Sequence, residues 1–280
     1  MIREIQAQEI TKTIAALCQQ SNVTLGDDIV GSLQRAEQNE DWPPARHTLR
    51  QLLKNLDIAE TERLPICQDT GMACVFLEIG QNLHIQGDLR QAVDEGVRQG
   101  YAEGYLRKSI VRDPLRRENT GDNTPAMLHC DILPGDALRI TVAPKGFGSE
   151  NMSKIAMLRP SDGEEGVKNF VLEVVRAAGP NPCPPLVVGV GIGSNFDGVA
   201  LLAKKALLRP IDTAHPDPHY AQMEADWLLA INQLGIGPQG FGGRCTALGL
   251  NIQSAPTHIA GLPVAVNLCC HVARHASAVL

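Results

Sequence analysis

The stretch PICQDTG, residues 65–71, places a cysteine, an amide and a carboxylate side by side between a proline and a glycine. Proline, aspartate and glycine are common in tight turns, so an ordinary surface turn with a chance cysteine is one interpretation. The alternative is that Cys67, Gln68 and Asp69 are held together on this turn for chemistry. The rest of the chain has to decide between the two.

Two further polar segments interrupt an otherwise apolar chain. RKSIVRDPLRRENTGDNTP, residues 107–125, is rich in arginine and also carries acidic residues. Such a charge run is usually a solvated face, whereas the alternative is an arginine site whose planar fork holds a carboxylate. PKGFGSENMS, residues 144–153, has glycines at positions 146 and 148 that would let backbone amides approach an anion. A tight turn between strands explains the same glycines.

The eight cysteines lie at positions 18, 67, 74, 130, 183, 245, 269 and 270. No pair has CxxC spacing, so a metal site would need ligands from distant segments. The opening MIREIQAQEI does not resemble a secretion signal, which argues against a disulfide framework. Most of the cysteines are expected to be small buried hydrophobes, and Cys18, Cys74 and Cys130 in particular lie in apolar patterns.

Cys183 differs from these, because it stands between two prolines in NPCPP just before an apolar run. A backbone direction fixed by proline suits a ligand better than a packing residue. The glycines that follow, at 189, 191 and 193, suggest a dinucleotide fingerprint, but Phe196 stands where a later glycine is required. Walker A is also absent, so nucleotide binding is not expected.

Composition excludes several classes of protein. The chain of 280 residues is 44% hydrophobic and 20% charged, which is ordinary for a globular protein with a large core. A net charge of -6 without a basic stripe, together with 4% aromatic residues, argues against a nucleic-acid partner. No apolar run approaches the roughly 20 residues that span a bilayer. We therefore expect a cytoplasmic protein without a membrane segment.

Hydrophobic periodicity predicts an α+β fold that begins with helices and places the polar segments on loops. Helical spacing predicts helices at 3–20, 26–39 and 43–57, as a helical subdomain over about residues 1–60. Later helices are expected at 88–104 with Asp88 as N-cap, 166–179, 198–207 and 218–234, and strands at 74–80, 128–135, 137–146, 184–193, 246–253 and 262–270. Strands and helices alternate too irregularly along the chain for a doubly wound sheet. Because no linker is evident, one domain over residues 1–280 is expected.

Six segments in order resemble the α subunit, or N-terminal domain, of class I iron-sulfur fumarate hydratase, in the fumarate/tartrate hydro-lyase family. These segments are CQDTG, LRKSIVRDPLRRENTGDNTPAMLH, KGFGSENMS, PCPPLVVGVGIG, LGIGPQGFGGRCTALGLNI and PTHIAGLPVAVNLCCHVARH. In that family three cysteines from distant segments hold a 4Fe-4S cluster whose fourth iron binds the substrate. The resemblance implies Cys67 and Cys183 as ligands. For the third, LCCHVARH offers two neighbours, of which the family pattern selects Cys270, with Cys269 packed in the core.

The same resemblance implies roles for the other site residues. Asp69 would serve as, or assist, the catalytic base, and Gln68 would hydrogen-bond the substrate. Arg107 would bind a substrate carboxylate, which the backbone amide of Gly148 would also reach, and His258 would orient Asp69. An iron with an open position is a Lewis acid for the hydroxyl of a 2-hydroxy acid, while a positioned base removes the proton from the adjacent carbon.

The resemblance also implies a partner and a substrate class. Enzymes of the family have a second domain, so we expect a separate β subunit to complete the site, with an α dimer inside a heterotetramer. The substrate would be a small dicarboxylate. The SIVRDPLRRENTGDNTP pattern favours fumarate and L-malate, with tartrate second and mesaconate as a further alternative. A non-catalytic iron-sulfur sensor would leave Gln68, Asp69 and Arg107 unexplained, and a cluster-free structural protein would leave CQDTG and PCPP unexplained.

Overall fold

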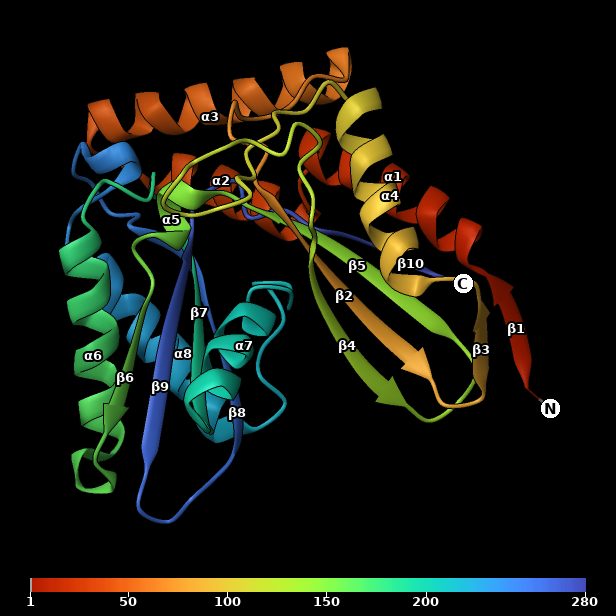
Figure 1. Cartoon of the computed structure of the whole chain (residues 1–280). Helices are drawn as coiled ribbons and strands as arrows, with labels where there is room; N and C mark the ends of the chain where they lie inside the picture. Colours follow the sequence, from red (N-terminus) through yellow and green to blue (C-terminus); the bar gives the residue numbers. More distant parts are fainter. Residues whose placement is uncertain (1) are drawn as a thin grey trace. The chain divides into compact units, whose positions relative to one another are not determined.

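The computed structural model of the chain describes residues 2–280, which divide into two compact units (Figure 1). Unit 1 comprises the residues up to Leu25, Leu56–Phe147 and Arg274–Leu280, and unit 2 comprises Gly26–Asn55 and Gly148–Ala273. Residues 1–60, expected as one helical subdomain, are thus distributed over both units, and the single domain over 1–280 stays a prediction. No helix within residues 2–280 is long and apolar enough to cross a membrane.

Unit 1 is built on a four-stranded sheet of order β10-β5-β2-β4 (Figure 1). Its strands are β2 (Met72–Gly80), β4 (Met127–Leu133), β5 (Leu138–Lys145) and β10 (Ala276–Val279), and its helices include α1 (Ala7–Val23) and α4 (Leu89–Glu103). β2 is the central strand, parallel to β4 and antiparallel to β5. Its alternate residues Val75 and Leu77 are buried in one core with Ile14 of α1 and Val97 of α4. One face of β2 and the apolar faces of α1 and α4 therefore meet in one apolar layer.

Two local expectations in unit 1 are corrected. The predicted helix over 3–20 begins only at Ala7, because residues 3–6 form strand β1 (Arg3–Gln6), which pairs in parallel with β3 (Leu83–Gln86). The strands predicted at 128–135 and 137–146 exist as β4 and β5, but they do not pair with each other. β2 lies between them and bonds to both, so the Pro-Gly turn joins strands that are not neighbours.

Unit 2 contains the second four-stranded sheet, of order β6-β9-β7-β8. Its strands are β6 (Lys154–Leu158), β7 (Leu186–Ser194), β8 (Ala247–Thr257) and β9 (Leu262–Cys269). Its helices are α2 (Asp27–Asn39), α5 (Phe147–Glu150, which begins in unit 1), α6 (Gly163–Ala178), α7 (Phe196–Ala206) and α8 (Pro218–Asn232), with 3-10 turns at Pro160–Asp162 and Pro238–Gly240. α3 (Pro43–Glu62) belongs to both units. The predicted α+β class with an N-terminal helical segment is confirmed.

The glycine-rich strand β7 owes its glycines to helix packing. Val264 and Val266 of β9 face the core shared with α6 and α8, whereas Ala265 faces α7 on the other side of the sheet (Figure 1). On that side, a Cβ at Gly189 or Gly191 would lie 2.2 or 2.3 Å from a backbone oxygen of α7. These two glycines therefore allow α7 to approach β7, which accounts for Gly189 and Gly191 without a nucleotide.

Candidate active site

The CQDTG turn of unit 1 is fixed by its own aspartate. Asp69 Oδ1 accepts the Gly71 N–H at 3.0 Å, and Asp69 Oδ2 accepts the N–H of Phe147 at 3.0 Å. The Asp69 N–H in turn donates to Cys67 Sγ at 3.4 Å. The turn thus presents a sulfur and a carboxylate whose orientations are coupled.

Buried side chains hold the turn from behind. The Tyr101 hydroxyl donates to the carbonyls of Thr70 at 2.7 Å and Gly71 at 3.1 Å, and Asn123 Nδ2 donates to the Gly71 carbonyl at 3.2 Å. Both side chains are fully buried. Burial raises the pKa of Tyr101, so its phenol remains a donor. Neither Tyr101 nor Asn123 was singled out in the sequence, where a tyrosine in an amphipathic helix and an asparagine in a polar loop carry no specific signal.

Substitution of glycine by alanine is expected to affect stability differently at Gly71 and at Gly148. Gly71 has φ +77°, and a Cβ there would lie 2.7 Å from the Lys145 backbone nitrogen, whereas a Cβ at Gly148 would meet only the Asn181 carbonyl oxygen at 3.9 Å. Gly71→Ala is therefore expected to lower the free energy of unfolding by about 2 kcal/mol or more, since backbone strain and a close contact add. Gly148→Ala should leave it unchanged within about 0.5 kcal/mol. Chemical denaturation of both variants measures this, and equal losses would contradict the geometry.

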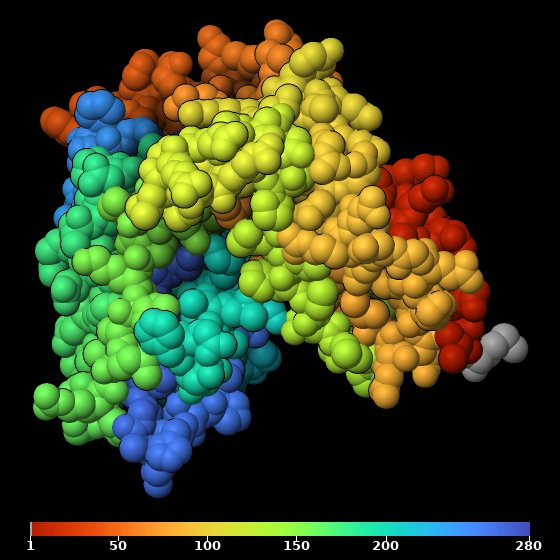
Figure 2. Space-filling model, in the orientation of Figure 1, coloured from red at the N-terminus to blue at the C-terminus, as the bar shows by residue number. Residues whose placement is uncertain are grey.

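Arg107 is connected to the turn through its backbone. Its carbonyl accepts the Thr70 hydroxyl at 3.1 Å, while its side chain is exposed. Gln68 is exposed as well. Most of the residues from Arg107 to Arg117 belong to the surface drawn in yellow in Figure 2. The structure therefore brings Cys67, Gln68, Asp69 and Arg107 into one region of unit 1, with the two polar side chains at 68 and 107 open to solvent.

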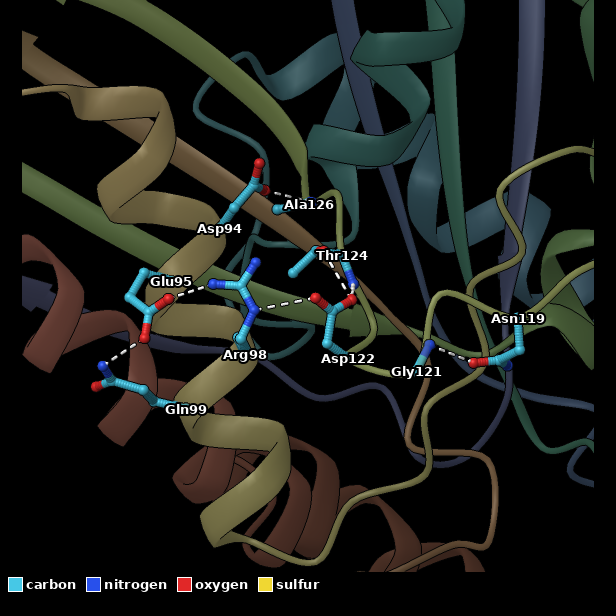
Figure 3. A network of polar contacts seen from close by, with 9 residues as sticks. All are labelled: Asp94, Glu95, Arg98, Gln99, Asn119, Gly121, Asp122, Thr124 and Ala126. Atoms are coloured by element: carbon cyan, nitrogen blue, oxygen red, sulfur yellow. Dashed lines mark hydrogen bonds and ion pairs between the residues drawn. The ribbon is translucent and has the colours of Figure 1, made fainter.

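The remainder of the 107–125 segment is anchored to α4 by polar contacts (Figure 3). Arg98 forms ion pairs with Glu95 and with Asp122, and Arg98 Nε lies 3.0 Å from Asp122 Oδ2. Asp122 Oδ1 accepts two hydrogen bonds from Thr124, one from its backbone N–H at 3.1 Å and one from its hydroxyl at 2.8 Å. Partial burial raises the pKa of Asp122, but the bonds from Thr124 and Arg98 outweigh it and lower the pKa to about 2. This end of the segment is structural, whereas the Arg107 end reaches the turn.

Cys183 and Cys270 lie at one end of the sheet in unit 2. Cys183 is exposed, has φ +56° and precedes β7, while Cys270 is half-buried and follows β9. Because Val187 of β7 is paired with Cys269 of β9, these two strand ends are adjacent. The His271 N–H and Nδ1 both lie near the Cys183 carbonyl oxygen, at 3.5 and 3.1 Å. The two segments predicted to supply ligands are therefore neighbours within unit 2.

Exposure separates the predicted ligands from three of the other five cysteines, but not from Cys130 and Cys245. Cys18, Cys74 and Cys269 are buried, and burial raises the pKa of Cys18 to about 12. The pKa of Cys245 is also raised to about 12, mainly by burial and to a smaller extent by the negative charge of Glu40. The thiols of Cys18 and Cys245 therefore stay protonated. Cys130 was expected to be buried, and this is wrong: it is exposed, because β4 is an edge strand with an open face.

No disulfide forms among the eight cysteines, all of which lie in the described residues. Within residues 2–280, no group of three or more His, Cys, Asp or Glu side chains is assembled to hold a metal ion. Cys67 belongs to unit 1, and Cys183 and Cys270 belong to unit 2. The ligand assignments accordingly stay predictions.

His258 lies at the opposite end of the unit 2 sheet from the two cysteines. It follows β8, whose Thr257 is paired with Ser194 at the end of β7, whereas Cys183 precedes the start of β7. The seven residue steps from Val187 to Ser194 span about 23 Å at the rise of a strand. His258 is exposed, and its Nδ1 accepts the Ala260 N–H at 3.2 Å. Within unit 2, His258 therefore lies far from Cys183, and its predicted role toward Asp69, a residue of unit 1, stays a prediction.

The family model described as fumarate hydratase (Fumerase) matches residues 11–279. The chain belongs to this family. A putative L(+)-tartrate dehydratase subunit alpha from Methanocaldococcus jannaschii is 42% identical over 275 residues, covering 96% of this chain and 96% of the relative. The L(+)-tartrate dehydratase subunit alpha of Escherichia coli strain UTI89 is 33% identical over 270 residues, which cover 95% of this chain and 89% of the relative. The same subunit of strain K12 is 32% identical over 270 residues.

Membership of the fumarate hydratase family confirms the resemblance found in the sequence and the enzyme class that it implied, a hydro-lyase. The match extends through both units, since it includes the CQDTG turn, the NPCPP turn and the end of β9. A hydro-lyase removes or adds water, a reaction that uses a proton-transfer group. The roles of Asp69 and Arg107 in such a reaction stay predictions.

Proposed function

We propose that this chain is the α subunit of an iron-sulfur hydro-lyase that reversibly removes water from a four-carbon 2-hydroxy dicarboxylate. Cys67, Cys183 and Cys270 would hold a 4Fe-4S cluster. The observation that carries the proposal is the CQDTG turn, where a carboxylate held by two backbone amides adjoins a sulfur that accepts a third. Family membership over residues 11–279 supports it.

The residues present fit such a cluster. Thiolate ligands need accessible sulfurs, and Cys183 is exposed while Cys67 and Cys270 are half-buried. Cys269 is only 6% exposed, which supports Cys270 as the ligand from LCCHVARH. Three ligands would leave one iron open, and an open iron supplies a Lewis acid for a leaving hydroxyl.

The side chains of unit 1 would carry the remaining tasks. Asp69 would take the proton from the carbon next to the hydroxyl, because its two amide contacts orient the carboxylate and leave further lone pairs open. Gln68 would hydrogen-bond the substrate, and Arg107 would bind one substrate carboxylate with its planar fork. The backbone amide of Gly148 would add a donor to the same group. The role of His258 stays a prediction and takes no part in this scheme.

Arg107→Lys is expected to lower kcat/KM at least about tenfold, because lysine keeps the charge but loses the paired geometry. Arg116→Lys and Arg117→Lys are matched controls, since both side chains are exposed on the same segment, and they should change kcat/KM less than about twofold. The assay uses the complex with its partner subunit, with iron content measured for each variant. Equal, small effects at all three positions would make residues 107–117 an ordinary charged face.

Two substrates remain as candidates, each with its own support. The full SIVRDPLRRENTGDNTP pattern favours L-malate and fumarate, while the names of the two relatives favour L-tartrate. The relatives are named as alpha subunits, and this supports a separate β subunit for this chain, with an α dimer inside a heterotetramer as the expected assembly. The ratio of kcat/KM for L-malate to that for L-tartrate, measured on the anaerobic complex, decides between the substrates.

A further inference from the structure

Arg274 lies directly behind the CQDTG turn in unit 1, in a position that the scheme above does not use. Its side chain is only 6% exposed, and Nη2 donates to the Asp69 carbonyl oxygen at 2.5 Å. Its other donors, Nε and Nη1, are buried and have no hydrogen-bond partner. A guanidinium cannot lose its proton, so a positive charge with unused donors is buried here.

No carboxylate of residues 2–280 forms an ion pair with Arg274. The acidic group nearest along the turn, that of Asp69, has its two oxygens on the amides of Gly71 and Phe147. The Tyr101 phenol on α4, which donates to this turn, is neutral because burial raises its pKa. Proteins rarely bury a charge without a counter-charge, since removing it from water has a large free-energy cost. Arg274 therefore indicates an anion that belongs at the turn.

We propose that Arg274 is a positioning residue for the iron-sulfur cluster, and that its charge compensates the anion held at Cys67. This inference rests on the cluster proposed above. Arg274 binds the carbonyl of Asp69, and the N–H of the same residue donates to Cys67 Sγ, so one residue of backbone links guanidinium and sulfur. The cluster with its thiolate ligands is anionic and resident. A substrate carboxylate must exchange with solvent, which suits the exposed Arg107 rather than a buried guanidinium.

The simpler role for Arg274 is a clamp on the Asp69 carbonyl. The two roles differ in the metal-free protein. A clamp stabilises the chain with or without the cluster, so its loss lowers the thermal midpoint of both forms equally. A counter-charge is unfavourable until its anion is present. Its removal would leave the metal-free midpoint unchanged or raised, and would weaken only the cluster-loaded form.

The experiment compares wild type, Arg274→Met, Arg274→Gln and Arg274→Lys as full-length chains reconstituted anaerobically at limiting iron and sulfide. Methionine replaces the buried stem without a charge or an unused donor, and lysine restores the charge. We expect Arg274→Met to bind the cluster about tenfold or more weakly, as for other groups that support metal ligands, with a metal-free midpoint no lower than that of wild type. Arg274→Lys should recover most of the affinity. Arg116→Gln, on an exposed arginine, is the control and should match wild type.

Each alternative outcome has a definite meaning. Equal loss of midpoint in both forms of Arg274→Met, with normal iron content, would make Arg274 a clamp and overturn the proposal. Normal cluster affinity with lost dicarboxylate binding would assign the anion to the substrate and overturn it as well. If Arg274→Met does not fold, the cluster affinities of Arg274→Gln and Arg274→Lys are compared instead. Equal affinities in these two variants would show that the positive charge at position 274 does not support cluster binding, and would contradict the proposal. A wild-type chain without a cluster would instead refute the proposed function.

Discussion

Cys67→Ser is expected to reduce cluster iron from about four atoms per chain to background, since serine replaces a thiolate with a poor ligand for an iron-sulfur cluster. The same result is expected for Cys183→Ser and Cys270→Ser. Total iron and acid-labile sulfide in anaerobically reconstituted protein measure the effect, and circular dichroism confirms that each variant is folded. Activity in the complex should fall with the iron content.

Cys269→Ser is the matched control, because Cys269 adjoins Cys270 but is buried in β9. It should keep the cluster, with a cost in stability of about 1 kcal/mol for a hydroxyl in a buried site. The opposite pattern, with iron lost from the Cys269 variant and retained in the Cys270 variant, would reverse the assignment of the third ligand.

Asp69→Asn is expected to lower kcat by about 100-fold or more with the cluster still bound, as for the loss of a positioned proton-transfer group. Asparagine can accept only one of the amides that the carboxylate now accepts, from Gly71 and Phe147. A loss of stability of about 1 kcal/mol should therefore accompany the loss of rate.

Asp113→Asn is the control for removal of the charge alone, since Asp113 lies in the same unit and a single oxygen, Oδ1, accepts both of its backbone amides, from Leu115 and Arg116, so that asparagine can still accept them. It should leave kcat unchanged. Steady-state rates with iron content checked in each preparation make the comparison. Near-normal turnover of the Asp69 variant would assign the base to another group, and the β subunit would then be the place to look for it.

The long periodic elements of this fold could be read from the sequence, and the short ones could not. The helix at 88–104 with Asp88 as N-cap is found as α4, where Asp88 accepts the Gln91 N–H at 2.9 Å. The strand at residues 3–6 was missed, because four residues before an amphipathic helix are too few to show a separate period. Its pairing with β3, some 80 residues away, is what decides the conformation.

The site shows the same division between local and distant information. The residue types of CQDTG and the prolines around Cys183 could be noticed in the sequence, whereas Cys270 was singled out only by the family resemblance; Cys183 is exposed and Cys270 is half-buried. Arg274 was passed over, because an arginine after LCCHVA carries no signal of burial, and its contact with Asp69 joins residues 205 positions apart. Only the fold could show that this cation is buried without a counter-charge.

The central claim, that an iron-sulfur cluster of this chain drives a dehydration, is tested most directly by following activity and cluster content together. The chain is purified anaerobically with its β subunit, and water loss from L-malate and L-tartrate is measured before and after brief exposure to oxygen, then after anaerobic treatment with ferrous iron and a thiol. We predict that dehydration of at least one of these substrates disappears with the labile iron and returns with it. A complex that dehydrates either substrate equally well without iron, or that binds a full cluster and dehydrates neither, would contradict the account.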